Sequence, residues 1–213
     1  MRRLLTRFEL GYAQCAILAA IGLQLSLHED FLVGPKYLIA GLEVLLVFGI
    51  GIATPLTHSF AAKVRRDFSL VLIALITAVN GASMLLVANS LLTGAIVTGH
   101  DIIFSVAAIY LTNVIIFSIW FWEIDSPGLT GVKKHDSEPQ FYFPQMMMRT
   151  ESAQRWEPSY FDYLYLSITN STAFSPTDTA PLTHGTKALM GLQAFISLIT
   201  VVLVTARVVT TLN

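Results

Sequence analysis

Residues 102–122 read IIFSVAAIYLTNVIIFSIWFW, a run of 21 residues without a charged side chain. A helix crosses the roughly 30 Å hydrocarbon core of a bilayer with about 20 predominantly apolar residues. The run ends in Trp120, Phe121 and Trp122, directly before Glu123, and aromatic side chains of this kind gather at the membrane interface. Residues 102–122 therefore predict a helix that spans a membrane.

The composition of the whole chain agrees with a membrane protein. The 213 residues are 54% hydrophobic and 13% charged, whereas a soluble domain is about 25% charged. This composition argues against a soluble globular enzyme, and the formal net charge of −1 excludes a disordered chain, which combines low hydrophobicity with high net charge. With 13 Lys and Arg against 14 Asp and Glu, there is no basic excess to bind nucleic acid. The expected partner is a lipid bilayer.

Four further stretches are long, apolar and almost free of charge. We therefore predict five membrane-spanning helices, at Leu10–Leu27, Tyr37–Leu56, Ser69 to about Gly94, Ile102–Trp122 and Ala188–Val209. The predicted fold class is an all-α polytopic membrane protein with one additional re-entrant loop. Its parts are a four-helix transmembrane region (1–122), a water-facing or interfacial loop (123–159) and a C-terminal unit (160–213).

Glu43 is the only acidic residue well inside a predicted span. Ionisable side chains within a bilayer are costly and often mark ion or proton pathways. One interpretation is a proton or cation relay. The other is a protonated or amide-paired carboxyl that holds helices together, as intramembrane polar side chains commonly do. The partners we expect for it are Gln14, Asn80 and Asn113.

Residues 160–183 have a different pattern. A short amphipathic stretch at 160–169 is followed by the polar, turn-rich run NSTAFSPTDTAPLT at 170–183 and then by the last long apolar stretch. A half-length helix, an irregular segment and a full helix form the layout of a re-entrant pore loop, because irregular backbone at membrane depth is tolerated where it lines a cavity. Such a loop directs a helix dipole and backbone carbonyls at an ion.

The stretch 162–207 resembles the pore helix, filter and inner helix of tetrameric potassium channels, whose pattern is D-x-L-Y-F-S-x-T-T-x-T-T-V-G-Y-G-D-x-x-P-x-T. The match runs without a gap, at Asp162, Leu164, Tyr165, Ser167, Thr169, Thr172, Asp178, Pro181 and Thr183. The resemblance implies a homotetramer with an axial pore. Four hydrophobic spans before such a loop also resemble an uncharacterised family of bacterial polytopic membrane proteins, which implies the bacterial cytoplasmic membrane.

The filter itself departs from the potassium-channel pattern. Where those channels have T-T-V-G-Y-G, this chain has Thr172, Ala173, Phe174, Ser175, Pro176 and Thr177. Glycine adopts the positive φ angles that point successive carbonyls at the ion, whereas Ser175 and Thr177 adopt them only at a cost. Potassium selectivity of the usual kind is therefore not expected.

Small residues recur at three-residue spacing in the last span, at Gly191, Ala194 and Ser197. Such a stripe suits either a pore lining or close packing between helices. Ser197 also falls where many potassium channels have a hinge glycine, so a bend of the inner helix at this position is not expected.

Two functions are consistent with these features. The first is passive, weakly selective cation permeation through a homotetramer, in which Thr172, Ser175 and Thr177 supply hydroxyls and a ring of Asp178 attracts cations. The second is a non-conducting membrane scaffold or sensor that keeps the channel architecture for packing. We expect no enzyme, because the chain has no Ser-His-Asp order, phosphate-binding loop or HExxH motif. We also expect no cofactor and no metal site, with monovalent cations in the pore as the only ligands.

Charge bias and the channel resemblance disagree about orientation. Lys and Arg number three before the first span, one between the first two, three at 55–68, none at 95–101 and four at 123–159. By the positive-inside rule, the N-terminus and the region 123–187 are cytoplasmic, whereas potassium channels place their filter loop outside. An inverted pore like that of glutamate-receptor channels, an external N-terminus or a different number of spans each removes the conflict. We favour a cytoplasmic N-terminus.

Overall fold

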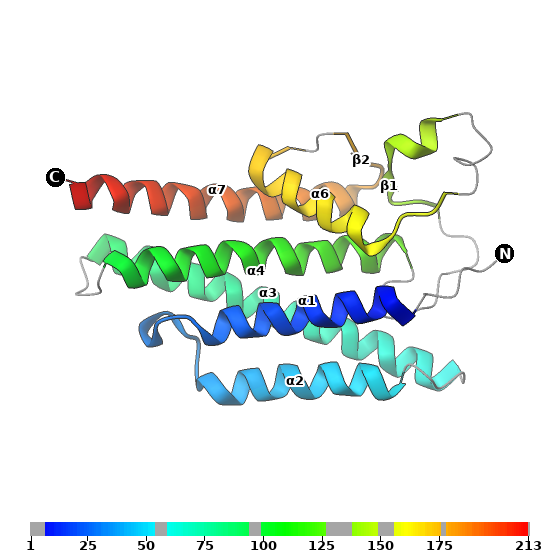
Figure 1. Cartoon of the computed structure of the whole chain (residues 1–213), viewed down its shortest axis with the longest axis horizontal. Coiled ribbons are helices and arrows are strands. Elements are labelled where there is room, and N and C mark those ends of the chain that lie inside the picture. Colours follow the sequence, from blue (N-terminus) through cyan, green and yellow to red (C-terminus); the bar gives the residue numbers. More distant parts are fainter. Residues whose placement is uncertain are drawn as a thin grey trace.

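The computed structural model describes residues 7–53, 59–93, 99–126, 138–148, 156–175 and 178–212. In these ranges the chain is predominantly helical, as predicted, and forms a bundle of long helices with one short helix at its edge (Figure 1). The helices are α1 (Arg7–Leu25), α2 (Lys36–Ala53), α3 (Ser59–Thr93), α4 (Gly99–Asp125), α6 (Tyr160–Ala173) and α7 (His184–Leu212). The remaining elements are the 3-10 turns η1 (Glu29–Phe31) and η3 (Pro144–Met147) and the strands β1 (Phe141–Tyr142) and β2 (Ala180–Pro181).

Three of these helices are long and apolar enough to cross a bilayer, over Asp67–Thr93, Gly99–Asp125 and His184–Ala206. This is compatible with an integral membrane protein. The apolar parts of α1 and α2, Glu9–Leu25 and Tyr37–Phe48, are shorter. The described residues therefore support three spanning helices, and the arrangement with five spans stays a prediction.

Two helices begin earlier than their apolar stretches. Helix α3 starts at Ser59, ten residues before the predicted span, and includes Lys63, Arg65 and Arg66. Lys and Arg are good helix formers, so charge ends the apolar part of this helix but not the helix itself. Helix α7 similarly starts at His184, four residues before its predicted span.

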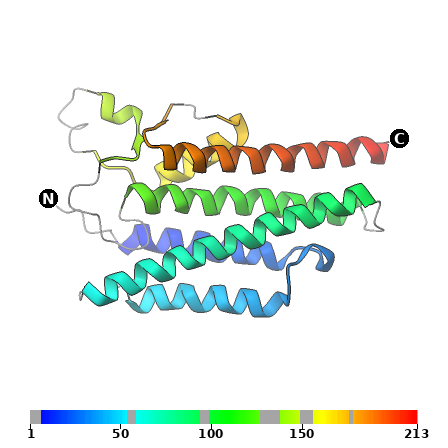
Figure 2. The same ribbon diagram turned by 180° about the vertical axis from the view of Figure 1, so that it is seen from behind.

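Helix α4 lies at the centre of the bundle and packs against α1, α3, α6 and α7 (Figures 1 and 2). It is apolar on all sides, which is typical of a helix surrounded by protein. In its most apolar 18-residue window, 67% of the residues are buried, compared with 22% in the corresponding window of α7. Helix α4 is therefore the core of the bundle, whereas α7 leaves most of its surface uncovered within a single chain.

The short helix α6 and the chain that follows it enter and leave the bundle at the same end. Helix α6 has 14 residues, which is about 21 Å at 1.5 Å per residue, and it starts at the end where α4 stops (Figure 1). Strand β2 then pairs with β1 back at that end, with Phe141 opposite Pro181. Helix α7 begins there and runs past α6 along the bundle (Figure 1). The path is a half-length helix, a return and a full helix, in the order that the sequence predicts.

Aromatic rings fasten the 138–148 segment to the start of α6. The Phe141 ring packs edge-on against Phe121 of α4, with 5.3 Å between centroids. Phe143 packs in the same way against Tyr163 of α6 and Trp156, each at 5.5 Å. Edge-to-face pairs add about 0.5–1.5 kcal/mol beyond the area that they bury. Within the predicted water-facing or interfacial loop, Phe141 and Phe143 are thus buried core residues.

Candidate functional site

Helix α6 begins at a local cap formed by Ser159 and Asp162. The Asp162 carboxylate accepts hydrogen bonds from the Ser159 backbone N–H and from its hydroxyl, both at 2.7 Å. A carboxylate in the first turn is also favoured by the helix dipole. Asp162, which matches a pore-helix position of the potassium channels, therefore fixes where α6 starts.

Asp125, the last residue of α4, joins three elements at this end of the bundle. Its Oδ1 accepts hydrogen bonds from the backbone N–H groups of Gln140, at 2.5 Å, and Phe141, at 3.3 Å. Its Oδ2 accepts a hydrogen bond from the Tyr163 hydroxyl at 2.5 Å. Burial, followed by the negative charge of Asp125, raises the pKa of the Tyr163 phenol well above its usual value. The phenol therefore keeps the proton that it donates to Asp125.

Gln193 of α7 fastens the second half of α6. Its Nε2 donates hydrogen bonds to the hydroxyls of Ser167, at 2.6 Å, and Ser171, at 2.7 Å. Its Oε1 accepts a hydrogen bond from Asn170 Nδ2 at 2.8 Å. The Ser167 hydroxyl in turn donates to the Val114 carbonyl of α4 at 2.6 Å. Because all four polar side chains are buried, this network sets the position of α6 against α4 and α7.

Ser197, predicted on the inner helix, is buried against α4. It accepts a hydrogen bond from Asn113 Nδ2 at 3.0 Å. Gly191 points the other way, and a Cβ built on it has no atom within 4 Å; Ala194 is half-buried. Among the described residues, Gly191 therefore makes no close contact, whereas Ser197 is buried and bonded to α4.

Two of the three residues expected to pair with Glu43, Asn80 and Asn113, form hydrogen bonds elsewhere. Asn113 donates to Ser197, as described above, and Asn80 Nδ2 donates to the Ile109 carbonyl of α4 at 3.2 Å. The amide that faces the Glu43 carboxyl belongs to Gln24 of α1. The reason is geometric, because the rotation of each helix in the bundle decides which polar side chains meet.

The filter-like residues from Thr172 to Ser175 lie exposed at the end of α6. The Thr172 hydroxyl donates to the Ile168 carbonyl of its own helix at 2.9 Å. On the outer face of α6, Tyr165 is 55% exposed, and Thr169 also donates to carbonyls of the preceding turn. Pro176 and Thr177 lie outside the described residues, and the chain resumes at the exposed Asp178.

One residue at the end of α6 has the left-handed conformation that glycine favours. Phe174 closes α6 with φ 54° and ψ 22°, and it is the one non-glycine residue with positive φ in the described ranges. Ser175, which aligns with a filter glycine, has no positive φ, and Thr177, which aligns with the other, lies outside the described residues. Helices commonly end with a left-handed residue, usually glycine. Phe174 aligns with the valine of the channel pattern, so the strained position is the end of α6 rather than a lost filter glycine.

Replacing Phe174 tests this strain. Phe174→Gly is expected to exceed Phe174→Ala in free energy of unfolding by about 1 kcal/mol, because only glycine adopts the left-handed conformation without cost. Both variants lose the same partly exposed ring, so alanine is the matched control. Chemical unfolding in detergent micelles measures the difference. Equal stabilities of the two variants contradict a strained Phe174.

The chain after Asp178 is held at the end of the bundle where α6 began. Leu182 N–H donates to the Gln140 carbonyl at 2.9 Å, and Thr183 Oγ1 donates to Gln140 Oε1 at 2.9 Å. The backbone N–H of Thr186 donates to Thr183 Oγ1 at 3.3 Å, so Thr183 also caps the start of α7. Pro181 and Thr183, two residues that match the potassium-channel pattern, therefore lie next to the segment around Gln140 that is hydrogen-bonded to Asp125.

No known protein family, characterised protein or solved structure matches the chain. Across the ranges that the structure describes, no three His, Cys, Asp or Glu side chains gather where they could hold a metal ion. What the site offers instead is a short helix fixed at both ends, with an exposed loop of hydroxyls and carbonyls followed by an acidic residue.

Three residues that organise the site carried no functional signal in the sequence. Asp125 stands at the end of an apolar run, Gln140 in a charged loop, and Gln193 among small apolar residues. A polar residue inside an apolar stretch does indicate a packing contact, and this signal applies to Gln193. Nothing in the spacing marks Asp125 or Gln140.

Proposed function

We propose that the chain forms a homotetrameric pore for passive, weakly selective permeation of cations, as a protein with five spans in a bacterial cytoplasmic membrane. The observation that carries this proposal is the path of the chain through α6. A half-length helix packs on two long helices, and the following residues return to the end where the helix began. This path suits a re-entrant loop.

The position of this loop favours a pore between copies rather than within one chain. The loop lies at the edge of the bundle, beside α7 (Figure 1), while the centre is filled by α4. The outward side of α7 carries exposed apolar side chains, which are Leu192, Phe195, Leu198, Val201 and Val202. A fourfold arrangement that covers α7 places the exposed residues 172–175 and Asp178 around a common axis.

The charge pattern supports a loop that opens to the cytoplasm. Eleven of the 13 Lys and Arg residues lie before or at the start of α1, in the first two turns of α3, or between α4 and the first turn of α7. The starts of α1, α3 and α7 and the end of α4 are at one end of the bundle (Figure 1). By the positive-inside rule this end is cytoplasmic, which is the reverse of the potassium-channel orientation.

Cation flux through the purified protein in lipid vesicles tests the proposal. Wild-type protein is expected to collapse a gradient of potassium or sodium. Asp178→Asn is expected to reduce the flux about tenfold at low salt, because a ring of like charges concentrates counter-ions at a pore mouth. The reduction should nearly vanish at about 1 M salt, where the Debye length falls to about 3 Å.

The matched control is Glu157→Gln, which removes an exposed acidic charge that lies outside the loop. It is expected to leave the flux unchanged at every salt concentration. Wild-type vesicles without flux at any voltage or pH contradict the pore. That outcome favours the second function, a non-conducting scaffold or sensor, which is supported by the Thr172 hydroxyl bonding to its own helix and by the left-handed Phe174.

A further inference from the structure

Gln24 and Glu43 meet deep in the bundle, far from the filter-like loop. Their side chains lie on α1 and α2, and their residues are 5% and 0% exposed. One end of the Gln24 amide faces the carboxyl, 3.0 Å from Oε2 and 3.2 Å from Oε1 of Glu43. The other end lies 3.4 Å from the backbone carbonyl of Ile76 on α3. The amide therefore contacts both α2 and α3.

An amide has a donor end and an acceptor end, so the protonation of Glu43 decides which way it points. When Glu43 carries a proton, its O–H donates to Gln24 Oε1, and Gln24 Nε2 donates to the Ile76 carbonyl. When Glu43 is ionised, it only accepts, so Gln24 must turn Nε2 towards it. Oε1 then faces the Ile76 carbonyl, and the hydrogen bond between α1 and α3 is lost.

Nothing described around Glu43 holds it in the charged form. The ion pairs found among the described side chains are His28–Asp30 and His100–Asp101, and neither includes Glu43. An ionised carboxylate buried without a partner charge is costly and tends to neutralise. Protonated and ionised Glu43 therefore each require a different orientation of the Gln24 amide.

The titratable groups on the helices around the pair are distant along each helix. Helix α3 has none between Ser69 and Thr93. On α1 the nearest is Cys15, nine residues and about 13 Å before Gln24, and on α2 they are Lys36 and Tyr37, at least six residues and about 9 Å before Glu43.

The connection between α1 and α2 holds three further titratable residues. His28 contacts Asp30, and its backbone N–H donates to Ser105 of α4. Glu29 and Asp30 are exposed. These three residues therefore contact α4 or solvent, and Glu43 is the acid that contacts the Gln24 amide.

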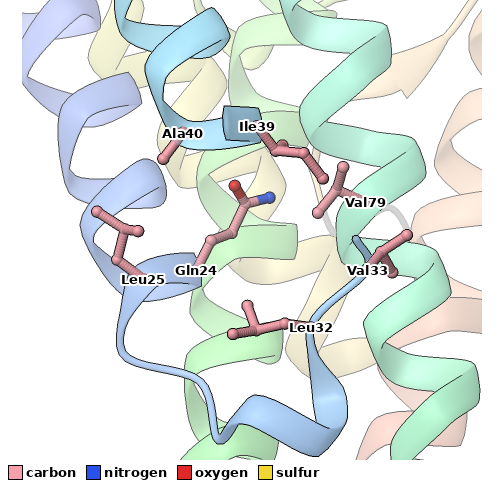
Figure 3. Close-up of a pocket in the computed structure, with 7 residues that line it drawn as sticks. All are labelled: Gln24, Leu25, Leu32, Val33, Ile39, Ala40 and Val79. Carbon is pink, nitrogen blue, oxygen red and sulfur yellow. The ribbon is translucent and has the colours of Figure 1, made fainter. Parts of the chain in front are cut away.

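A partly open hollow reaches the Gln24 side of the pair. It lies between α1, α2 and α3 beside the α1–α2 connection, and Gln24 has the one polar side chain among the seven that line it (Figure 3). Its volume for a water-sized probe is about 20 Å³. The Gln24 amide is therefore the polar group of the pair that borders this hollow, and Glu43 lies behind it.

We propose that Gln24 and Glu43 form a proton-binding site whose occupancy switches α1 between a hydrogen bond to α3 and one to α2. Uptake of a proton from water converts the Glu43 carboxylate to the acid, and the O–H bond forms on the oxygen that faces Gln24. Release returns that proton to water and turns the amide. The switch acts in α1–α3 and does not depend on whether the loop after α6 conducts.

Infrared difference spectra of the full chain in lipid vesicles, recorded between neutral and alkaline pH, test this site, because exposed Asp and Glu stay ionised throughout this range. The wild type is expected to show the carbonyl band of a protonated carboxyl at neutral pH and to lose it at alkaline pH. Glu43→Gln is expected to lose that band from the difference spectrum, because glutamine keeps the shape but not the proton. Glu29→Gln, which replaces an exposed acid at the same end of the bundle, is the control and should keep it.

Gln24→Leu provides a second variant that keeps the acid. It removes the acceptor for the Glu43 O–H, so the carbonyl band is expected to move to higher frequency, and the glutamine signal that accompanies the titration should disappear. A wild type without a titrating carboxyl band overturns the proposal. So does a band that persists in Glu43→Gln, or one that Gln24→Leu leaves unmoved.

Discussion

Asp125→Ala is expected to lower the free energy of unfolding by about 3–4 kcal/mol, the largest effect of any substitution considered for this chain. The carboxylate accepts hydrogen bonds from two backbone N–H groups and from the Tyr163 hydroxyl. Hydrogen bonds to charged groups contribute about 1.5–3 kcal/mol each, and a buried donor left without a partner adds a desolvation cost. Chemical unfolding in detergent micelles measures the loss.

Three controls separate this role from a general effect of mutation. Asp125→Asn keeps one acceptor oxygen and is expected to lose about half as much stability as the alanine variant. Tyr163→Phe keeps the packed ring and removes one donor, for a loss of about 1–2 kcal/mol. Glu157→Ala removes an exposed acid and should change stability by less than about 0.5 kcal/mol. An Asp125→Ala protein as stable as Glu157→Ala contradicts the assigned contacts.

The helices of this fold could be predicted from the sequence because their signal is local. The uncharged run at 102–122 lies within α4, and the short stretch after Pro158 became α6. Such stretches are recognised by length and apolar composition alone. The same signal predicted only the apolar parts of α3 and α7, and both helices begin several residues before those parts. At α7 the reason is Thr183, whose hydroxyl caps the first turn.

The contacts that hold the site could not be predicted in the same way. Glu43 was expected to meet Gln14, Asn80 or Asn113, yet Gln24 faces it. Each of these amides lies on an apolar helix, and a rotation of that helix by a few tens of degrees changes its neighbour. Side-chain spacing fixes which residues share a face but not what that face meets.

The filter-like loop combines a predictable element with an unpredictable one. The departure of the filter from the channel pattern is visible in the sequence, whereas the left-handed conformation of Phe174 was not expected. Its place at Phe174 depends on where α6 ends, and helix ends vary by one or two residues around any sequence signal.

Two polar clusters form hydrogen bonds to the two halves of α6. Asp125 binds the first half through Tyr163, and Gln193 binds the second half through Ser167, Asn170 and Ser171. Between these contacts the outer face, including Tyr165, stays uncovered. A short helix of 14 residues is marginal by itself, so it depends on its contacts with the bundle, which include these two clusters, the hydrogen bond between Tyr160 and Ser118 and the burial of Leu166.

Gln193→Leu removes the second attachment and is expected to cost about 2–3 kcal/mol. Leucine fills the volume but leaves the Ser171 hydroxyl and one Asn170 N–H without their partner. Interhelical hydrogen bonds in membrane proteins average about 0.6 kcal/mol and reach about 1.7 kcal/mol, and Gln193 makes several of them. Chemical unfolding in detergent micelles gives the loss. In vesicles that conduct, the variant should also lower the flux, because α6 no longer holds the loop in place.

Thr200→Val is the matched control on the same face of α7. Thr200 is buried like Gln193, but its hydroxyl donates to the Ile196 carbonyl of its own helix at 2.7 Å, and its contact with another helix is a weak one, to Met84 Sδ of α3 at 3.7 Å. Its replacement is therefore expected to cost less than about 1 kcal/mol. A double variant of Gln193→Leu with Ser167→Ala should lose less than the sum of the two single losses, because both remove the same hydrogen bond. Strict additivity shows that Gln193 stabilises α7 alone and does not fasten α6.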